Sequence, residues 1–397
     1  MRRAPLLVAL FLAALALRPQ LVGIGPLLPS IQKDLGVSHA VAGLLGTIPV
    51  LCMGLFAPPA PYLSGRIGTR HAVAAALALI GVFGVVRALV PGAAGVILLT
   101  FPIGIGMGLA GAMLPVAVKE RFADRPGFAT GVYTSGITIG SALAAALAVP
   151  LADLAGGWRT PLLCFGAVST ALAALWLWLT RSEPRHVRVD LRPLRLPLRS
   201  PLAWRLVAAF FFMSSVFYGL NAWLPDAYVE RGWSEGAAGG LLAVLNTVTI
   251  PCGFLVAWAA DHWGSRRVWL AAAAALQVLA LLGIVLWPGG GWLWAVLLGV
   301  AIGPLFPLTM TLPLDAAVRP AQVAALAGMM LGIGYTLSAS SPLLLGAIRD
   351  LTGGFDAVLW TLVAAAIVLL VVDASFSPAR LAAGRSSGER PLRAASS

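Results

Sequence analysis

Apolar residues dominate the chain in long runs, and short polar stretches separate one run from the next. A run of about 20 apolar residues is long enough to cross the hydrocarbon core of a bilayer as a helix. The pattern predicts spans near residues 4–30, 39–60, 71–90, 93–117, 127–151, 160–180, 203–227, 236–258, 267–287, 292–314, 321–347 and 356–376. Twelve spans place both termini on the same side of the membrane.

Composition supports an integral membrane protein. The 397 residues are 59% hydrophobic and only 11% charged, and the mean hydropathy is +0.92. Soluble domains average about 45–50% apolar and about 25% charged residues. The first run follows two arginines, as in a signal peptide, but it continues past Arg18 without a small-residue cleavage site. We therefore expect it to remain as the first span.

The net charge of +12 follows from the expected topology. Most of the 27 Lys and Arg residues lie at the N-terminus, in the loops after even-numbered spans and in the C-terminal tail. Cytoplasmic loops collect basic residues, so both termini are predicted to be cytoplasmic and no nucleic-acid partner is expected. The three cysteines all lie within apolar runs. They predict neither a disulfide framework nor a metal site, and no cofactor is expected.

The two halves of the chain repeat. Residues 42–70 align with 238–266 without a gap, and Asp153–Trp158 matches Asp350–Phe355. Such a repeat predicts two six-helix bundles related as parallel repeats, with a solute site between them near the midplane. We place the N-terminal bundle at 1–180 and the C-terminal bundle at 203–376. The Arg/Pro-rich segment 181–202 is predicted to be a cytoplasmic linker, and 377–397 a disordered cytoplasmic tail.

Two short loops at equivalent positions of the repeat have similar sequences. Residues 63–70 read LSGRIGTR and residues 259–266 read AADHWGSR. Both resemble the loop signature of major facilitator transporters, in which glycine permits a tight turn and charged residues latch the inner gate. The predicted gating residues are Arg66, Gly68, Arg70, Asp261, Gly264 and Arg266. Because Gly65 occupies the acidic position of the first copy, the latch is expected in the second; a plain basic turn is the alternative.

Longer stretches resemble one branch of these transporters, the cyanate permease/2-nitroimidazole transporter (CynX/NimT) family. The matching segments are 17–19, 25–29, 48–58, 131–134, 156–159, 223–225, 306–307, 328–329, 334–335, 342–346 and 350–354. The resemblance implies an all-α integral membrane protein with the major facilitator fold, located in a bacterial inner membrane. We expect a monomer. The implied substrates are cyanate-like anions or nitroimidazole-like compounds.

Arg18 is the residue whose position most needs an explanation. It follows Ala4 by 14 residues, or about 21 Å of helix, and is therefore still deep in the first span. An arginine at the bilayer centre costs about 2.5–3.5 kcal/mol on insertion scales. No Asp or Glu lies deep in any segment, so a small anion or polar solute is the predicted partner. The alternative is a structural arginine bonded to helix carbonyls around Pro19.

Further candidates for solute binding lie in other spans. Arg87 is the second cation, although its position near the outer end of the third span would also let the side chain reach water. Ser214, Tyr218 and Asn221 form a polar stripe on the seventh span, the counterpart of the first. Tyr218 and Asn221 are predicted to hydrogen-bond the solute, or else to join neighbouring helices. The weaker candidates are Asn246, Thr134 and Tyr335.

These features together predict a secondary transporter that moves a small anionic or polar solute by alternating access around Arg18. A rival function is efflux of nitroimidazole-like or other small aromatic compounds, for which Arg18 would be dispensable. A membrane sensor or scaffold would be expected to carry an added soluble domain. Neither a nucleophile–base pair nor a cofactor loop is visible, so an enzyme is not expected. Without a deep carboxylate, uniport, exchange and protons carried with the solute all remain open.

Overall fold

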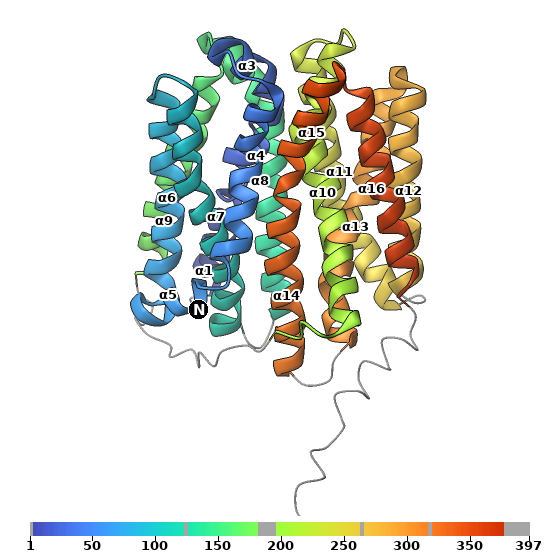
Figure 1. The fold of residues 1–397 in the computed structure, drawn as a ribbon. Coiled ribbons are helices and arrows are strands. Elements are labelled where there is room, and N and C mark those ends of the chain that lie inside the picture. Colours follow the sequence, from blue (N-terminus) through green and yellow to red (C-terminus); the bar gives the residue numbers. More distant parts are fainter. Residues whose placement is uncertain (1–2, 123–125, 182–195, 263–265, 317–319, 377–397) are drawn as a thin grey trace, which may run out of the picture.

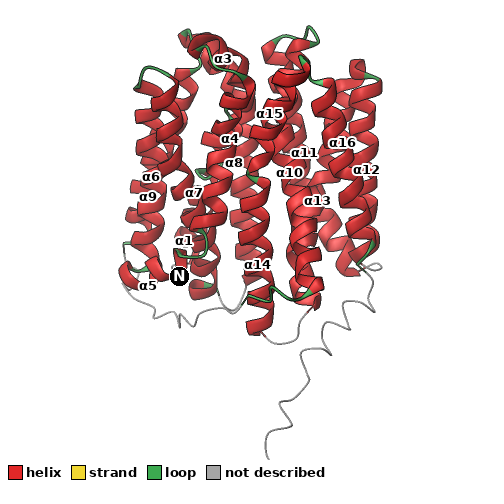
Figure 2. Ribbon diagram, viewed as in Figure 1, coloured by secondary structure: helices red, strands yellow, loops and turns green. Residues whose placement is uncertain are grey.

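The computed structural model describes residues 3–122, 126–181, 196–262, 266–316 and 320–376. Within these ranges the chain forms helices and connecting turns, without a strand (Figure 2). Most of the predicted linker, 182–195, and the tail 377–397 lie outside the described residues. The elements are α1 (Arg3–Leu15), α2 (Pro19–Val22), η1 (Gly25–Leu27), α3 (Leu28–Leu35), α4 (His39–Phe56), α5 (Ala60–Ile67), α6 (Thr69–Leu89), α7 (Ala93–Arg121), α8 (Pro126–Ala155), α9 (Arg159–Leu179), α10 (Pro201–Glu230), α11 (Glu235–His262), α12 (Arg266–Leu286), η2 (Pro288–Gly290), α13 (Gly291–Ala316), α14 (Pro320–Ser338), α15 (Ser340–Thr352) and α16 (Asp356–Ala374).

The prediction of twelve spans is confirmed. Twelve helical segments of the described chain are long and apolar enough to cross a membrane. Two of them extend further than the apolar runs indicate, because the first continues to Leu35 and the eleventh to Thr352. Both extensions end in polar turns, which a hydropathy pattern excludes even where the helix continues.

The first and eleventh spans are interrupted. The first is divided into α1, α2, η1 and α3, with the main break at residues 16–18. Pro19 follows this break; proline lacks an N–H group and restricts the residue before it. In the eleventh span, Ala339 separates α14 from α15. Irregular backbone at membrane depth is tolerated where it is buried in protein or lines a cavity. The breaks therefore mark the interface side of these two spans.

The helices form two bundles, as the repeat predicts. In Figure 1, α1–α9 group on one side of the molecule and α10–α16 on the other. The bundles meet along two seams, in which α4 packs against α14 and α15, and α8 packs against α11. The described chain begins and ends at the same end of the molecule. We call this the terminal end; the opposite end, which carries α3 and the start of α4, is the distal end.

The seam between α4 and α15 is tight near the distal end. A Cβ atom added to Gly43 would lie 2.6 Å from the carbonyl oxygen of Pro342, so glycine is required for this approach. One turn further along α4, the Thr47 hydroxyl accepts a hydrogen bond from the Leu343 N–H at 3.1 Å. A cavity of about 20 Å³ beside Gly43 is lined by residues of both bundles, among them Leu28 and Asn221. It has room for about one water molecule, so the bundles are closed to solute here.

Candidate functional site

Arg18 lies at the break of the first span and faces the second bundle. It is the residue before α2, with φ −106° and ψ −19°. Its guanidinium carbon lies 5.8 Å from the centre of the Phe217 ring and 5.6 Å from that of Tyr218, both on α10. The hydroxyls of Tyr218 and Tyr335 are also close enough to interact with the guanidinium. The structure thus brings together three of the predicted site residues, which come from α2, α10 and α14.

The aromatic rings leave much of the hydrogen-bonding capacity of Arg18 free. A guanidinium has five N–H donors, and the Arg18 side chain is partly exposed despite its depth in the span. Among the described residues, no carboxylate lies within 4 Å of it, and it makes no hydrogen bond to a helix carbonyl. Whether Arg18 is a structural residue or binds solute stays a prediction. Cation–π contacts position the charge without neutralising it.

Asn221, one turn further along α10, forms a polar pair with Asn246 of α11. The Asn246 side-chain amide donates to the Asn221 side-chain oxygen at 3.2 Å and to Leu242 O at 3.0 Å. The Asn221 amide donates to Phe217 O at 2.8 Å. Both residues are buried. These contacts match the alternative in which the polar side chains join neighbouring helices. Binding of a solute by the pair stays a prediction.

The asparagine pair gives a prediction about stability. Substituting Asn221→Ala and Asn246→Ala singly and together should reveal a coupling energy of about 0.5–1.5 kcal/mol, the range of hydrogen bonds between membrane helices. The measurement is reversible unfolding of the purified protein in mixed detergent. Thr361→Ala is the control partner, because that hydroxyl bonds only to Ala357 O of its own exposed helix. Additive effects of the two asparagine substitutions would contradict the pairing.

Arg87 lies apart from these residues. Its side chain is fully buried, so the expectation that it reaches water at the end of its span is wrong. The guanidinium donates to the Thr100 hydroxyl at 3.1 Å, to Gln20 O at 3.1 Å and to Gln20 Oε1 at 2.6 Å. Gln20 in turn donates to Leu162 O at 2.9 Å. Arg87 can be buried instead of reaching water because these oxygen atoms accept hydrogen bonds from its guanidinium.

Thr134 makes a local contact. Its hydroxyl donates to Gly131 O of the preceding turn of α8 at 3.1 Å. The structure does not bring it to the Arg18 side chain, whose close contacts come from α10 and α14. A solute role for Thr134 stays a prediction.

The predicted gating residues make contacts within each bundle. In the first copy, Arg70 donates to Leu177 O at 2.8 Å and joins α6 to α9, Arg66 lies over the Tyr62 ring, and Gly68 has a positive φ of 81°. In the second, Arg266 pairs with Asp315 at 2.6 Å and joins α12 to α13. Gly264 and the side chain of Asp261 lie outside the described residues, so the latch itself stays a prediction.

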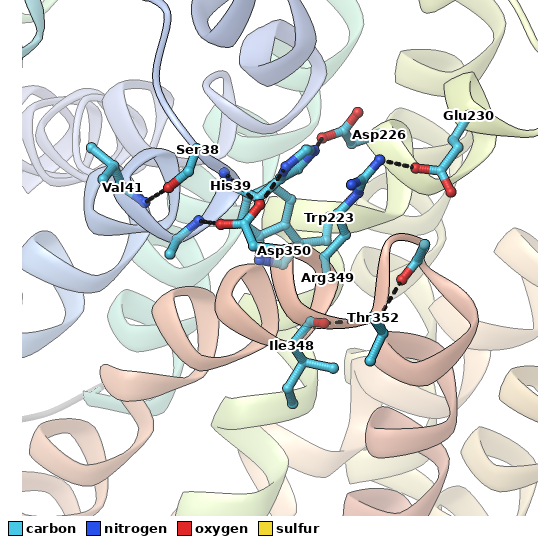
Figure 3. Close-up of polar contacts among 12 residues, drawn as sticks. Ser38, His39, Val41, Trp223, Asp226, Glu230, Ile348, Arg349, Asp350 and Thr352 are labelled. Atoms are coloured by element: carbon cyan, nitrogen blue, oxygen red, sulfur yellow. Dashed lines mark hydrogen bonds and ion pairs between the residues drawn. The ribbon is translucent and has the colours of Figure 1, made fainter.

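A cluster of charged residues lies at the distal end, where sequence analysis did not predict a site. Asp350 of α15 caps the start of α4, because its carboxylate accepts from His39 N at 3.1 Å and from Ala40 N at 2.7 Å (Figure 3). The His39 ring lies 2.9 Å from Asp350 and 3.6 Å from Asp226. A carboxylate at a helix N-terminus is stabilised by the free N–H groups and the helix dipole. We call His39, Asp226 and Asp350 the distal cluster.

A second ion pair adjoins the distal cluster within the C-terminal bundle. Arg349 donates to Glu230 at 2.7 Å (Figure 3), and its guanidinium lies over the Phe355 ring. The rings of Trp223, His39 and Phe355 contact one another, and the Trp223 N–H donates to Pro342 O at 2.8 Å. The position of His39 at the start of a span was the available signal, but its partner Asp350 lies 311 residues away in the chain.

Carboxylates are more buried than their positions near span ends indicate. Asp373 near the end of α16 is fully buried, and neither of its oxygens has a hydrogen-bond partner among the described residues. Its helix packs against α10 and α12. In the part of the chain that the structure describes, no three His, Cys, Asp or Glu side chains are arranged to hold a metal ion.

Comparisons with known proteins agree with this architecture. The family model of the Major Facilitator Superfamily matches residues 6–339. Cyanate transport protein CynX of Escherichia coli (strain K12) is 32% identical over 380 residues, covering 94% of this chain and 98% of that protein. The 2-nitroimidazole transporter of the same strain is 32% identical over 361 residues, covering 89% and 90%. A solved structure of a D-xylose–proton symporter has the same fold, with a TM-score of 0.77 and 18% identity over 95% of this chain and 98% of that one.

Proposed function

The chain belongs to the Major Facilitator Superfamily, and from this premise we propose that it moves a small anionic or polar solute of the cyanate kind across a bacterial inner membrane. The fold and the relatives make it a secondary transporter and not an enzyme. The proposal adds the class of solute, the site beside Arg18 and the orientation in the membrane.

The observation that carries the proposal is an arginine with free donors at the interface of the bundles. Arg18 is deep in its span, partly exposed, and surrounded by aromatic rings instead of carboxylates. A charge in this setting is costly unless something neutralises it. A small anion that enters between the bundles would supply the missing partner, and the planar guanidinium suits bidentate recognition of oxygen or nitrogen acceptors.

The relatives support a small solute of this chemistry. Two relatives at 32% identity are named for transport of cyanate and of 2-nitroimidazole. Cyanate is a compact monovalent anion, which fits a single arginine. The aromatic rings of Phe217, Tyr218 and Tyr335 around the guanidinium favour a second candidate, efflux of nitroimidazole-like or other small aromatic compounds that stack on such rings.

The orientation follows from the positive-inside rule. Basic residues gather at the terminal end, so we place both termini in the cytoplasm and the distal end outside. In this orientation the distal cluster and the Gly43–Pro342 contact close the outer side of the transporter. Alternating access would then require the two bundles to rock apart at the distal end and together at the terminal end.

A ligand-stabilisation screen tests the proposal. The melting temperature of the purified protein would be measured with cyanate, nitrate, bicarbonate, formate and 2-nitroimidazole, against chloride at equal ionic strength. A ligand at 100 times its Kd stabilises the folded state by about 2.7 kcal/mol. We expect an anion to stabilise the wild type and to lose this effect in Arg18→Ala.

The matched control for the screen is Arg181→Ala. The Arg181 guanidinium also lies over an aromatic ring, that of Trp178, but its side chain is exposed at the end of α9. This variant should respond to anions like the wild type. Equal stabilisation of the wild type and Arg18→Ala by anions would contradict the proposed site. Stabilisation of both by 2-nitroimidazole alone would favour the aromatic substrate.

A further inference from the structure

We propose that Arg87 is a positioning residue, which holds the break of the first span through Gln20 and thereby sets the place of the Arg18 guanidinium beside α10. The proposal assigns Arg87 no contact with solute, and it rests on the proposed function only in taking Arg18 as the solute-binding group.

The first step is the backbone at the break. In a regular helix the Ile24 N–H would donate to Gln20 O, four residues earlier. Here the Ile24 N–H donates to Leu21 O at 3.3 Å, and Gln20 O instead accepts from Arg87 at 3.1 Å. A backbone carbonyl released inside a membrane protein must find another donor. Arg87 supplies that donor, so the irregular turn between α2 and η1, which follows the main break at residues 16–18, depends on it.

The second step is the side chain of Gln20, which is fully buried. Its oxygen accepts from Arg87 at 2.6 Å, and its amide donates to Leu162 O at 2.9 Å. The amide fits against α6 because position 84 is glycine, where an added Cβ would collide with it. Gln20 thus ties α2 to both α6 and α9. The position of α2 is fixed from the side opposite to the one that Arg18 faces.

The third step is the burial of the Arg87 side chain and the neutral groups around it. The side chain has no exposed surface, and among the described residues no carboxylate lies within 4 Å of it. The Thr100 hydroxyl of α7 accepts from Arg87 at 3.1 Å and donates to Val96 O. The Arg87 Nε has no hydrogen-bond partner among the described residues. A buried cation held by neutral acceptors alone is costly. Its planar fork reaches α2 and α7 together, which a shorter polar residue could not do.

The experiment combines hydrogen exchange with ligand binding. Amide exchange of peptides covering residues 16–24 would be measured by mass spectrometry for the full chain in lipid nanodiscs. Arg87→Gln should exchange at least about tenfold faster there than the wild type, because charged hydrogen bonds to the break are lost. Arg87→Lys, which keeps a cationic donor, should exchange at an intermediate rate. Should the Gln variant fail to fold, Arg87→Lys and Thr100→Val carry the test.

Arg159→Gln is the matched control for exchange. Arg159 also donates to carbonyl groups at the end of α6, those of Ala88 and Val90, but has no bond to α2. It should leave exchange at residues 16–24 unchanged. If Arg87→Gln also leaves this exchange unchanged, Arg87 does not hold the break and the inference is overturned.

Binding of cyanate and nitrate then tests whether Arg87 acts through Arg18. Arg87→Gln should weaken binding of the anion about tenfold when Arg18 is present. It should have no further effect in the Arg18→Ala background, since a positioning residue has nothing left to position. Equal losses in both backgrounds would mean that Arg87 binds the anion independently, against the inference. If the wild type binds neither anion, the proposed solute class fails, and the exchange result alone decides the role of Arg87.

Discussion

Arg18→Gln is expected to lower the initial rate of cyanate transport into proteoliposomes about 10–100-fold. The substitution keeps a polar side chain of similar reach but removes the charge. A hydrogen bond to a charged group is worth about 1.5–3 kcal/mol, and each 1.4 kcal/mol changes binding tenfold. Arg18→Lys should give an intermediate rate, because it keeps the charge and loses the planar fork that lies beside Tyr218.

Two comparisons make this result specific to the site. Arg181→Gln, at an exposed arginine over the Trp178 ring, should transport at the wild-type rate. Tyr335→Phe removes a hydroxyl that interacts with Arg18 but keeps the charge and the aromatic ring, so it should reduce transport less than Arg18→Gln. Unchanged cyanate transport by Arg18→Gln would contradict the site. If 2-nitroimidazole transport alone fell after Tyr218→Leu, the aromatic substrate would be favoured.

The fold was largely predictable because the thickness of the bilayer core sets the length of each apolar run in the sequence. Runs of about 20 apolar residues and the internal repeat sufficed for twelve spans in two bundles. The breaks in the first and eleventh spans were less visible. Pro19 and Pro26 permit the breaks in the first span, but prolines also occur inside continuous helices such as α13. Tertiary contacts decide which prolines interrupt a helix, and a single sequence does not contain these contacts.

The candidate site was predictable only in part, for a related reason. The repeat placed the seventh span opposite the first, and the structure brings Tyr218 to Arg18. Tyr335 was a weak candidate because nothing local indicates that α14 lies against α10 at this level. The burial of Arg87 was misjudged because a long side chain near a span end can reach water. Its actual partner, Gln20, lies 67 residues away.

The distal closure is asymmetric with respect to the repeat. His39 of α4 and Asp350 of α15 form one contact between the bundles. Their counterparts in the repeat are Glu235 and Asp153, two carboxylates that would repel each other. Glu235 instead accepts a hydrogen bond from Ser30 at 3.1 Å, and Asp153 is exposed. The seam between α4 and α15 therefore carries the ionic contact between the bundles, and we expect its packing to control opening of the distal end.

Gly43→Leu is accordingly expected to hold the distal end open and to abolish transport. A side chain at Gly43 would collide with the backbone of Pro342 across the seam. Overpacking of this kind costs about 1–3 kcal/mol, which shifts an equilibrium between closed and open states about 5–150-fold. Transport should fall below about a tenth of the wild-type rate, since alternating access requires the distal end to close.

Labelling of a cysteine beside the seam measures the opening directly. Ala222→Cys, in a protein whose native cysteines are replaced by serine, lines the small closed cavity next to Gly43. A membrane-impermeant maleimide added from outside should label it about tenfold faster when Gly43→Leu is also present. Gly236→Leu is the control, because its Cβ would meet open space near the start of α11. Slow labelling together with normal transport in Gly43→Leu would show that this contact does not control the distal end.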